Sequence, residues 1–272
     1  MLERLMYKNH INEVIDFGVD GVYVNTSALH DYEWKVTSKG NRISAMKYSV
    51  QTRKLPVIIM CSTEDEGIEI RNRLFEVFEK DVLALQHGKV IIGDYYFKCF
   101  VTKSTKSDYQ KLKQYMSLTL TLSSDFPYWV KESTATYGIT GGAAEGMDYP
   151  FDYAFDYLSS NANTALNNTG FVASNFKMII YGACSNPTIN IAGHTYQVNC
   201  NVEAGEYLTV DSTTKKIFVT RNNGSIVNHF NDRNKQSYIF EKIPAGMNEV
   251  TWDGDFGFDI ILMEERSEPK WT

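Results

Sequence analysis

The acidic side chains of the second half of the chain are candidates for metal binding and for acid–base chemistry. The stretch "DGDFGFDIILMEE" places Asp253, Asp255 and Glu264 at the first, third and twelfth positions of an EF-hand calcium loop. The sixth position of that loop needs glycine, but Phe258 stands there, and Phe258 to Met263 has the pattern of a strand. A glycosidase would need two paired carboxyl groups, and the sequence singles out no such pair. We interpret these residues as surface carboxylates.

Histidines, cysteines and nucleophile motifs give no further sign of catalysis. No His-x-x-x-His or Cys-x-x-Cys pair is present to preorganise a zinc site. A Gly-x-Ser-x-Gly elbow, a P-loop and a dinucleotide fingerprint are also missing from the sequence. The four cysteines are scattered among hydrophobic neighbours, which favours buried free thiols over disulfides. We expect no enzymatic activity, no metal and no cofactor.

Aromatic side chains in the second half suggest carbohydrate binding as an alternative function. Domains made of two packed sheets often present Trp and Tyr faces to sugar rings. The candidates for such stacking are Tyr196, Tyr207 and Trp252. Packing in a hydrophobic core is the competing role for the same three rings.

The stretch "DYPFDYAFDY", residues 148–157, repeats aromatic residues and aspartates in the middle of the chain. Asp148, Asp152 and Asp156 would align on a helix, but Pro150 and the repulsion of three like charges argue against one. We therefore predict that the rings pin a connector against one or both flanking domains. These interdomain contact residues are Tyr149, Phe151, Tyr153, Phe155 and Tyr157.

Length, composition and charge indicate the broad class of protein. The chain has 272 residues, of which 43% are hydrophobic and 22% charged, enough for a folded protein with two domains. The net charge of −6 argues against specific nucleic acid binding, which needs a basic surface. The N-terminus lacks the apolar run of a secretory signal, and no window approaches the roughly 18 apolar residues of a membrane span. We expect a soluble protein, made in a cytoplasm, without direct membrane anchoring.

Strand patterns and one helix pattern fill residues 1–134. "YMSLTLTLS" alternates apolar and polar residues with a period of two, and "KVIIGDYYFKCFV" has the pattern of two strands joined through Gly93 and Asp94. "KLPVIIMCS" is a further apolar strand. The helix begins at "STEDEGIEI", where Thr63 and Glu66 have the spacing of a capping box. Its apolar face contains Ile70, Leu74, Val77 and Phe78, and its exposed side is predicted to carry the pairs Glu69–Arg73 and Glu76–Lys80.

The pattern changes after residue 134. Residues 135–165 are rich in glycine, aromatic residues and aspartate, so we predict an interdomain linker there. Residues 166–272 contain seven or eight short strands, which indicates an antiparallel β-sandwich. The predicted strands are "FKMIIYG", "TINIAGHTYQVN", "EYLTVD", "KIFVT", "SYIFEKI", "NEVTW" and "FDIILM".

Taken in order, these motifs resemble the distal tail proteins of phages with long non-contractile tails. Four features carry the resemblance: a β-rich first part with one helix, the exit "LTLTLSSDFPYWVKE", the linker "YPFDYAFDY", and a C-terminal sandwich that ends on "ERSEPKW". The resemblance covers essentially the whole chain. It implies a mainly β fold with an N-terminal α+β ring-forming domain (1–134) and a galectin-like C-terminal β-sandwich (166–272).

The resemblance also implies a structural role at the tip of the virion tail. In that family six N-terminal domains form a homo-hexamer ring, the hub, which continues the tail tube. The ring contacts the major tail tube protein on one side and the tail-tip hub, or tail-associated, protein on the other. The outer domains can support receptor-binding or upper baseplate proteins. A carbohydrate-binding adhesin that recognises the host cell wall through its sandwich remains the alternative.

Overall fold

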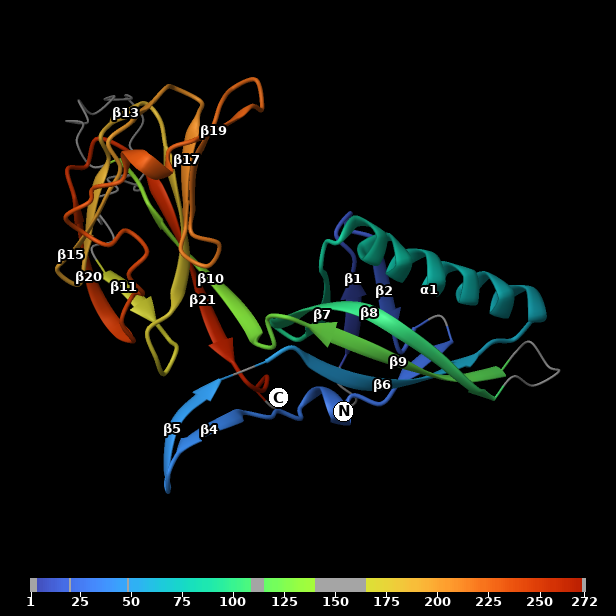
Figure 1. Ribbon diagram of the computed structural model, residues 1–272. Helices are drawn as coiled ribbons and strands as arrows, with labels where there is room; N and C mark the ends of the chain where they lie inside the picture. The colour runs from blue at the N-terminus through green and yellow to red at the C-terminus, as the bar shows by residue number, and fades with distance from the viewer. Residues whose placement is uncertain (1–3, 20, 48, 109–114, 140–164, 271–272) are drawn as a thin grey trace, which may run out of the picture. The chain divides into compact units, whose positions relative to one another are not determined.

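The computed structural model describes residues 4–19, 21–47, 49–108, 115–139 and 165–270 (Figure 1). The chain forms two compact units: one contains residues 1–131 and 265–272, and the other contains residues 132–264. Among the described residues, no helix combines the length and apolar character needed to cross a membrane.

The first unit is built from antiparallel strands: β1 (Leu5–Lys8), β2 (Val14–Phe17), β3 (Val22–Val24), β6 (Gln51–Met60), β7 (Gly88–Ile92), β8 (Tyr95–Asp108), β9 (Tyr115–Ser124) and the start of β10 (Trp129–Tyr137). Two sheets share β8, because its first part pairs with β7 and its second part with β9. The first sheet has the order β2-β1-β7-β8-β10, and the second continues from β8 through β9 and β6 to β3. Their apolar faces enclose one core.

Two local predictions for this unit are confirmed. Met116, Leu118, Leu120 and Leu122 of β9 are buried in alternation with less buried neighbours. The turn between β7 and β8 contains Gly93 with a φ of +55°, the left-handed conformation that glycine adopts at low cost. Alternating apolar residues and a Gly-Asp turn therefore specified the strands and their connection correctly.

The predicted helix is also confirmed as α1 (Glu64–Ala84). The Thr63 side chain caps it by accepting a hydrogen bond from the Glu66 backbone N at 3.2 Å. The Glu66 carboxylate accepts from the Ser62 backbone N at 3.0 Å, so this end has the reciprocal bonding of a capping box, shifted by one residue. Phe78 is buried and its ring meets that of Tyr7 edge-on at 4.8 Å, which packs the helix on β1.

The predicted ion pairs along the exposed side of α1 are wrong. Lys80 Nζ lies 2.7 Å from Glu13 Oε1, and Arg73 donates a hydrogen bond to the Val14 carbonyl at 3.0 Å. The turn between β1 and β2 lies beside the helix (Figure 1) and supplies these acceptors, so partners distant in sequence replace Glu76 and Glu69. The pKa of Glu13 is lowered by its hydrogen bonds from Lys80 and Asn9.

The second unit is the predicted antiparallel sandwich. Its strands are β11 (Ala165–Asn168), β12 (Asn175–Tyr181), β13 (Cys184–Ser185), β14 (Thr188–Ile191), β15 (His194–Gln197), β16 (Asn201–Val202), β17 (Tyr207–Asp211), β18 (Lys216–Thr220), β19 (Ile226–Asn228), β20 (Gly246–Trp252) and β21 (Phe258–Arg266). One sheet has the order β19-β18-β17-β12-β21, and the other has the order β11-β20-β14-β15. Apolar side chains of both sheets form its core.

One predicted strand of this unit, "SYIFEKI", is wrong. Residues 237–243 contain a bend and a turn but no strand, and only Ile243 makes a bridge, to Ser174. Ile239, Phe240 and Ile243 are nevertheless buried in the core. The apolar character of this stretch therefore reflects a loop that packs its side chains inward, a case that a strand pattern does not distinguish.

Above about pH 9 the free energy of unfolding should fall as pH rises, because two thiols keep their protons longer in the folded state. Burial raises the pKa of both Cys184 and Cys200 to about 11. Their contribution is fully present below the ordinary thiol pKa and is lost as pH rises toward the folded value. Urea unfolding at pH 8 and pH 10 should show a steeper loss for the natural protein than for the double variant Cys184→Ala/Cys200→Ala. Equal losses would contradict the prediction.

Candidate assembly surface

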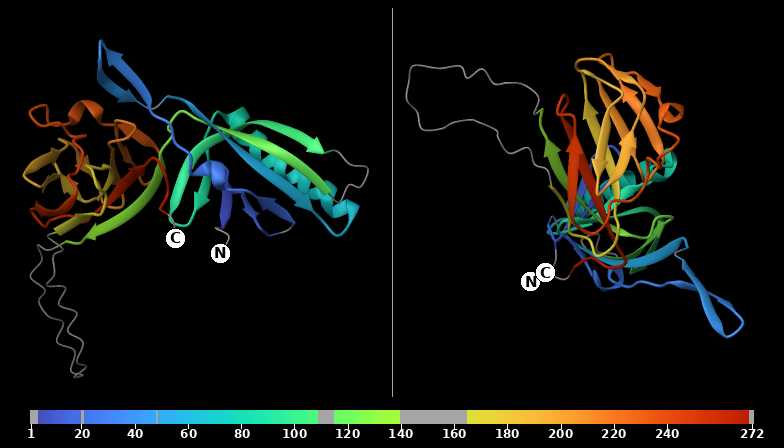
Figure 2. Two further views of the ribbon diagram at one scale, coloured as in Figure 1. Left: turned by 90° about the horizontal axis from the view of Figure 1, so that it is seen from below. Right: turned by 90° about the vertical axis from the view of Figure 1, so that its left-hand side faces the viewer.

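A hairpin formed by β4 (Lys35–Lys39) and β5 (Arg42–Lys47) projects from the first unit, away from its sheets (Figures 1 and 2). We call this hairpin, residues 35–47, the arm. All its residues are exposed except Ala45, which is half-buried. An isolated two-stranded hairpin is at best marginally stable in water. An arm of this kind therefore gains stability from a surface that covers it.

The arm carries unbalanced positive charge. Lys35 lies opposite Lys47 across the two strands, and Lys39 lies opposite Arg42. Like charges at directly opposed positions destabilise a hairpin, and residues 34–47 contain no acidic side chain to offset them. Carboxylates on a docking partner would remove this repulsion.

Apolar side chains are exposed between these charges. Val36 is paired across the strands with Met46, and Ile43 is 60% exposed near the tip. Adjacent exposed apolar side chains of this size are typical of protein–protein contacts. The arm therefore offers apolar contact flanked by cations, which fits a protein surface that is both apolar and acidic.

Hydrogen bonds join the segments that precede and follow the arm, which we call its root. The 3-10 helix η1 (Ser27–Leu29) precedes the arm and ends at Leu29. The Leu29 carbonyl accepts a hydrogen bond from the Arg53 guanidinium and another, at 3.2 Å, from Trp129 Nε1. Arg53 belongs to β6, the strand that follows the arm. One carbonyl therefore joins the segment before the arm, the segment after it and the start of β10.

The Arg53 side chain is 5% exposed, so its charge needs partners inside the unit. Its guanidinium lies 4.5 Å from the ring centroid of Phe97 and 5.9 Å from that of Trp129, within the range of cation–π attraction. It also donates to the carbonyl of Ser267, in the C-terminal segment, at 3.5 Å. Trp129 belongs to the predicted exit "LTLTLSSDFPYWVKE", and its fully buried ring anchors that stretch in the core of the first unit.

The outer surface of α1 has the opposite charge character to the arm. Glu69, Glu76 and Glu79 are exposed there, together with the apolar side chain of Phe75, which is 62% exposed. Beside them a groove of about 530 Å³ runs between α1 and the strands β8 and β9. Its lining is largely apolar and includes Phe75, Val82, Val101, Met116 and Leu118. The charged side chains of the lining are Glu79, Arg71, Lys103 and Lys106.

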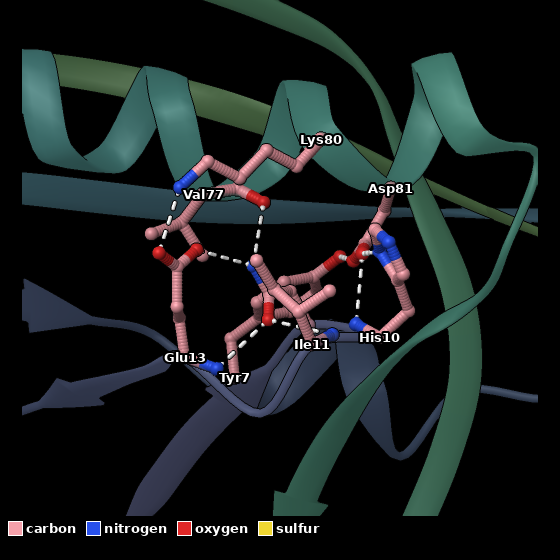
Figure 3. A network of polar contacts seen from close by, with 8 residues as sticks. Tyr7, His10, Ile11, Glu13, Val77, Lys80 and Asp81 are labelled. Atoms are coloured by element: carbon pink, nitrogen blue, oxygen red, sulfur yellow. Dashed lines mark hydrogen bonds and ion pairs between the residues drawn. The ribbon is translucent and has the colours of Figure 1, made fainter.

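A buried polar network fixes α1 on the sheet beneath it (Figure 3). The Asp81 carboxylate is fully buried and accepts a hydrogen bond from Tyr7 Oη at 2.6 Å and another from the His10 backbone N at 2.9 Å. His10 Nδ1 lies 2.5 Å from the same carboxylate. Burial, with further contributions from Cys99 and Asp81, raises the pKa of Tyr7 far above its usual value. The network positions the acidic face of the helix, and its occupied oxygens indicate a structural role.

The structure does not bring the three carbohydrate candidates together. Tyr196 lies on β15 and is 3% exposed, and its hydroxyl donates to the Glu241 carbonyl at 2.9 Å. Trp252 packs against the core, and its Nε1 donates to the Phe256 carbonyl at 3.1 Å. Tyr207 is 37% exposed on β17, in the other sheet. The buried ring of Tyr196 cannot stack on a sugar, whereas Trp252 is partly buried against the core.

The structure bears differently on the linker residues, on the calcium-loop candidate and on the arm. The linker contact residues 149–157 lie outside the described residues, so the domain boundaries at 134 and 166 and the anchoring role stay predictions. Phe258 starts β21 and is fully buried, as expected for a strand rather than a calcium loop. The arm was missed, although Gly40-Asn41 between two runs containing Val36 and Ile43 is a hairpin signal.

The fold as a whole is that of phage tail-hub and baseplate proteins. No protein-family model and no curated protein sequence matches the chain. Among solved structures, a chain of the phage P2 baseplate in its activated conformation with calcium aligns with a TM-score of 0.64 and 12% identity, over 99% of this chain and 100% of that chain. A chain of the same baseplate with strontium aligns with a TM-score of 0.62 and 12% identity, over 99% of this chain and 100% of that chain.

A third solved structure with a similar fold is Dit (gp 19.1) of phage SPP1, described as a paradigm of the hub adsorption apparatus in phages that infect Gram-positive bacteria. Its crystal structure aligns with a TM-score of 0.61 and 11% identity, over 98% of this chain and 100% of that chain. At these identities the likeness is one of fold. It confirms the mainly β architecture that the sequence predicts, with one α-helix among the described residues of the first part.

Proposed function

We propose that this chain is a structural protein of a phage tail, which forms a hub ring at the distal end of the tail tube. The observation that carries the proposal is the likeness to hub and baseplate chains over nearly the whole length of both partners. The ring would be a homo-hexamer located at the virion tail tip. Its role is to connect the tube to host-adhesion components, and the proposal includes no catalytic step.

The exposed surfaces support a ring made by unlike contacts. A closed ring requires one face of each subunit to meet a different face of the next subunit. The arm is basic and apolar, whereas the outer surface of α1 is acidic and apolar. We propose that the arm of one copy docks on α1 of its neighbour, where Glu76 and Glu79 can neutralise Lys35 and Lys47.

The proposed partners follow from a position between tube and tip. The major tail tube protein would bind one side of the ring and the tail-tip hub, or tail-associated, protein the other. Receptor-binding or upper baseplate proteins would dock on the second unit. Assembly of a ring that continues a tube needs neither nucleic acid recognition nor a membrane anchor.

Shortening the arm should abolish the ring without unfolding the subunit. Replacing residues 36–46 by Asn-Gly joins Lys35 to Lys47, which already lie opposite each other, through a two-residue hairpin turn. Light scattering coupled to size-exclusion chromatography should give the mass of a hexamer for the natural protein and of a monomer for the variant. The far-ultraviolet circular dichroism spectrum should keep its shape.

Charge reversal provides a finer test with a matched control. Lys35→Glu/Lys47→Glu should weaken the ring, and Glu76→Lys/Glu79→Lys on the neighbour should restore it in mixtures of the two variants. Lys177→Glu/Lys216→Glu, on the second unit, should leave the ring intact.

If the natural protein stays monomeric at high concentration, shows no ring in negative-stain micrographs and forms none with the tube protein, the hub proposal is wrong.

A further inference from the structure

A second hollow lies on the sandwich unit, remote in sequence from the arm and α1. It has a volume of about 510 Å³ and is formed by the loop after the 3-10 helix η2 (Phe230–Asp232) and by the turn between β17 and β18. This volume is in the range of sites for small ligands. The lining of the hollow includes Lys215, Phe230, Arg233, Lys235, Gln236 and Tyr238.

Rings and cations contact one another around this hollow. Lys215 Nζ lies 5.4 Å from the ring centroid of Tyr238 and 5.2 Å from that of Phe240. Arg233 Cζ lies 4.0 Å from the ring centroid of Phe230, which in turn stacks on Phe240 at 6.1 Å. These cation–π contacts hold two positive charges in place.

The loop that carries these side chains is tied to β15. Asn234 Nδ2 donates to Gln197 Oε1 at 2.9 Å, and Ser237 Oγ donates to the Thr195 carbonyl at 2.6 Å. The Tyr238 carbonyl accepts a hydrogen bond from His194 at 2.9 Å. A site preorganised in this way loses little conformational entropy when a ligand binds.

The charge of the hollow is opposite to that of the unit around it. Residues 132–264 contain more acidic than basic side chains, but the lining of the hollow includes three cations and no carboxylate. Lys215 and Lys235 form no ion pair within the described part of the chain. An anion can therefore approach without displacing an internal partner.

We propose that this hollow binds an anionic saccharide. Tyr238 is 55% exposed, so its ring can stack on the apolar face of a sugar. Lys215, Lys235 and the guanidinium of Arg233 would bind the phosphate or carboxylate of that sugar by charge-assisted hydrogen bonds. The Gln236 side chain, which is exposed, can bond to sugar hydroxyls. The concave shape and single exposed ring favour a saccharide over a protein partner.

The test measures binding of the full-length protein to three immobilised glycans by biolayer interferometry. The probes are phosphomannan, which carries phosphate, polygalacturonate, which carries carboxylate, and neutral mannan. We expect phosphomannan or polygalacturonate to bind at least about tenfold more tightly than mannan, with an affinity that falls as salt rises. The anion preferred identifies the source of the charge.

Variants locate the site. Tyr238→Ser and the double variant Lys215→Gln/Lys235→Gln should each weaken binding at least about tenfold. Tyr207→Ser and Lys216→Gln, an exposed ring and a neighbouring lysine outside the hollow, should change it by less than about twofold. Thermal unfolding checks that every variant is folded.

Four outcomes would overturn the proposal. The first three are equal binding of mannan and the charged glycans, no binding of either charged glycan, and unchanged binding in the variants of the hollow. Competition by a phosphoserine peptide as strong as that by mannose 6-phosphate would show that the hollow recognises the anion without the sugar, and would also refute it. The proposal does not depend on the ring, so the arm-shortened protein should bind the glycan with unchanged affinity.

Discussion

Replacing Gly88 with alanine should lower the free energy of unfolding of the first unit by about 3 kcal/mol or more. A Cβ at this position would lie 2.1 Å from Tyr7 Oη and 2.3 Å from Asp81 Oδ2. Both side chains are buried, and Gly88 itself begins β7 beside them. The extra methyl group therefore has no free space to occupy.

The cost is large because relief of the clash would break a buried hydrogen bond. Tyr7 and Asp81 are joined at 2.6 Å, and moving either apart leaves a polar group without its partner inside the core. Moving β7 instead would disturb its pairing with β1 and β8. Either adjustment lowers the free energy of unfolding by more than a typical surface substitution does. The effect should therefore appear as a fall of roughly 10 °C in the melting temperature.

Gly138→Ala, a glycine substitution in the second unit, is the control for Gly88→Ala. No atom lies within 4 Å of a Cβ placed at Gly138, and its φ is outside the left-handed range. Differential scanning calorimetry should show little change for this variant. If Gly88→Ala unfolded at the same temperature as the natural protein, the close contact of Gly88, Tyr7 and Asp81 would be wrong.

Local signals account for the parts of the fold that the sequence predicted. The period of β9, the turn at Gly93 and the cap at Thr63 each depend on a few adjacent residues, so they are visible without tertiary structure. The loop at residues 237–243 shows that a local pattern does not distinguish a strand from a loop that packs inward. Its apolar residues face the core from turns, and their composition alone resembles a strand.

Interactions between distant residues could not be predicted in the same way. Lys80 pairs with Glu13 instead of the nearby Glu76 because the fold places the β1–β2 turn beside the helix. The role of Tyr196 likewise depended on burial, which is a property of the assembled sandwich. The proposed glycan hollow combines Lys215 from a turn with Tyr238 from a loop, so no local sequence motif predicts it.

Substituting Arg53 with glutamine should destabilise the first unit and loosen the arm at the same time. The change removes a buried cation that lies near the rings of both Phe97 and Trp129, and it removes a donor to the Leu29 carbonyl. We expect a loss of about 2–4 kcal/mol in the free energy of unfolding, from the broken buried hydrogen bonds and the lost cation–π contact.

The effect on the arm separates this prediction from a general loss of stability. Hydrogen exchange of residues 32–47 should become faster even at temperatures where the variant is fully folded, since the Leu29 carbonyl no longer joins the two sides of the root. Arg53→Lys keeps the charge but lacks the forked donors, so it should give an intermediate result.

Lys54→Gln is the control, because Lys54 is the exposed neighbour of Arg53 on the same strand. It should leave stability and arm exchange unchanged. A mobile arm must be ordered when a neighbouring subunit binds it, and that ordering opposes association. The Arg53→Gln variant should therefore need a higher protein concentration to form the proposed ring. Arm exchange at the natural rate in a folded Arg53→Gln variant would show that the Arg53 contacts do not hold the root.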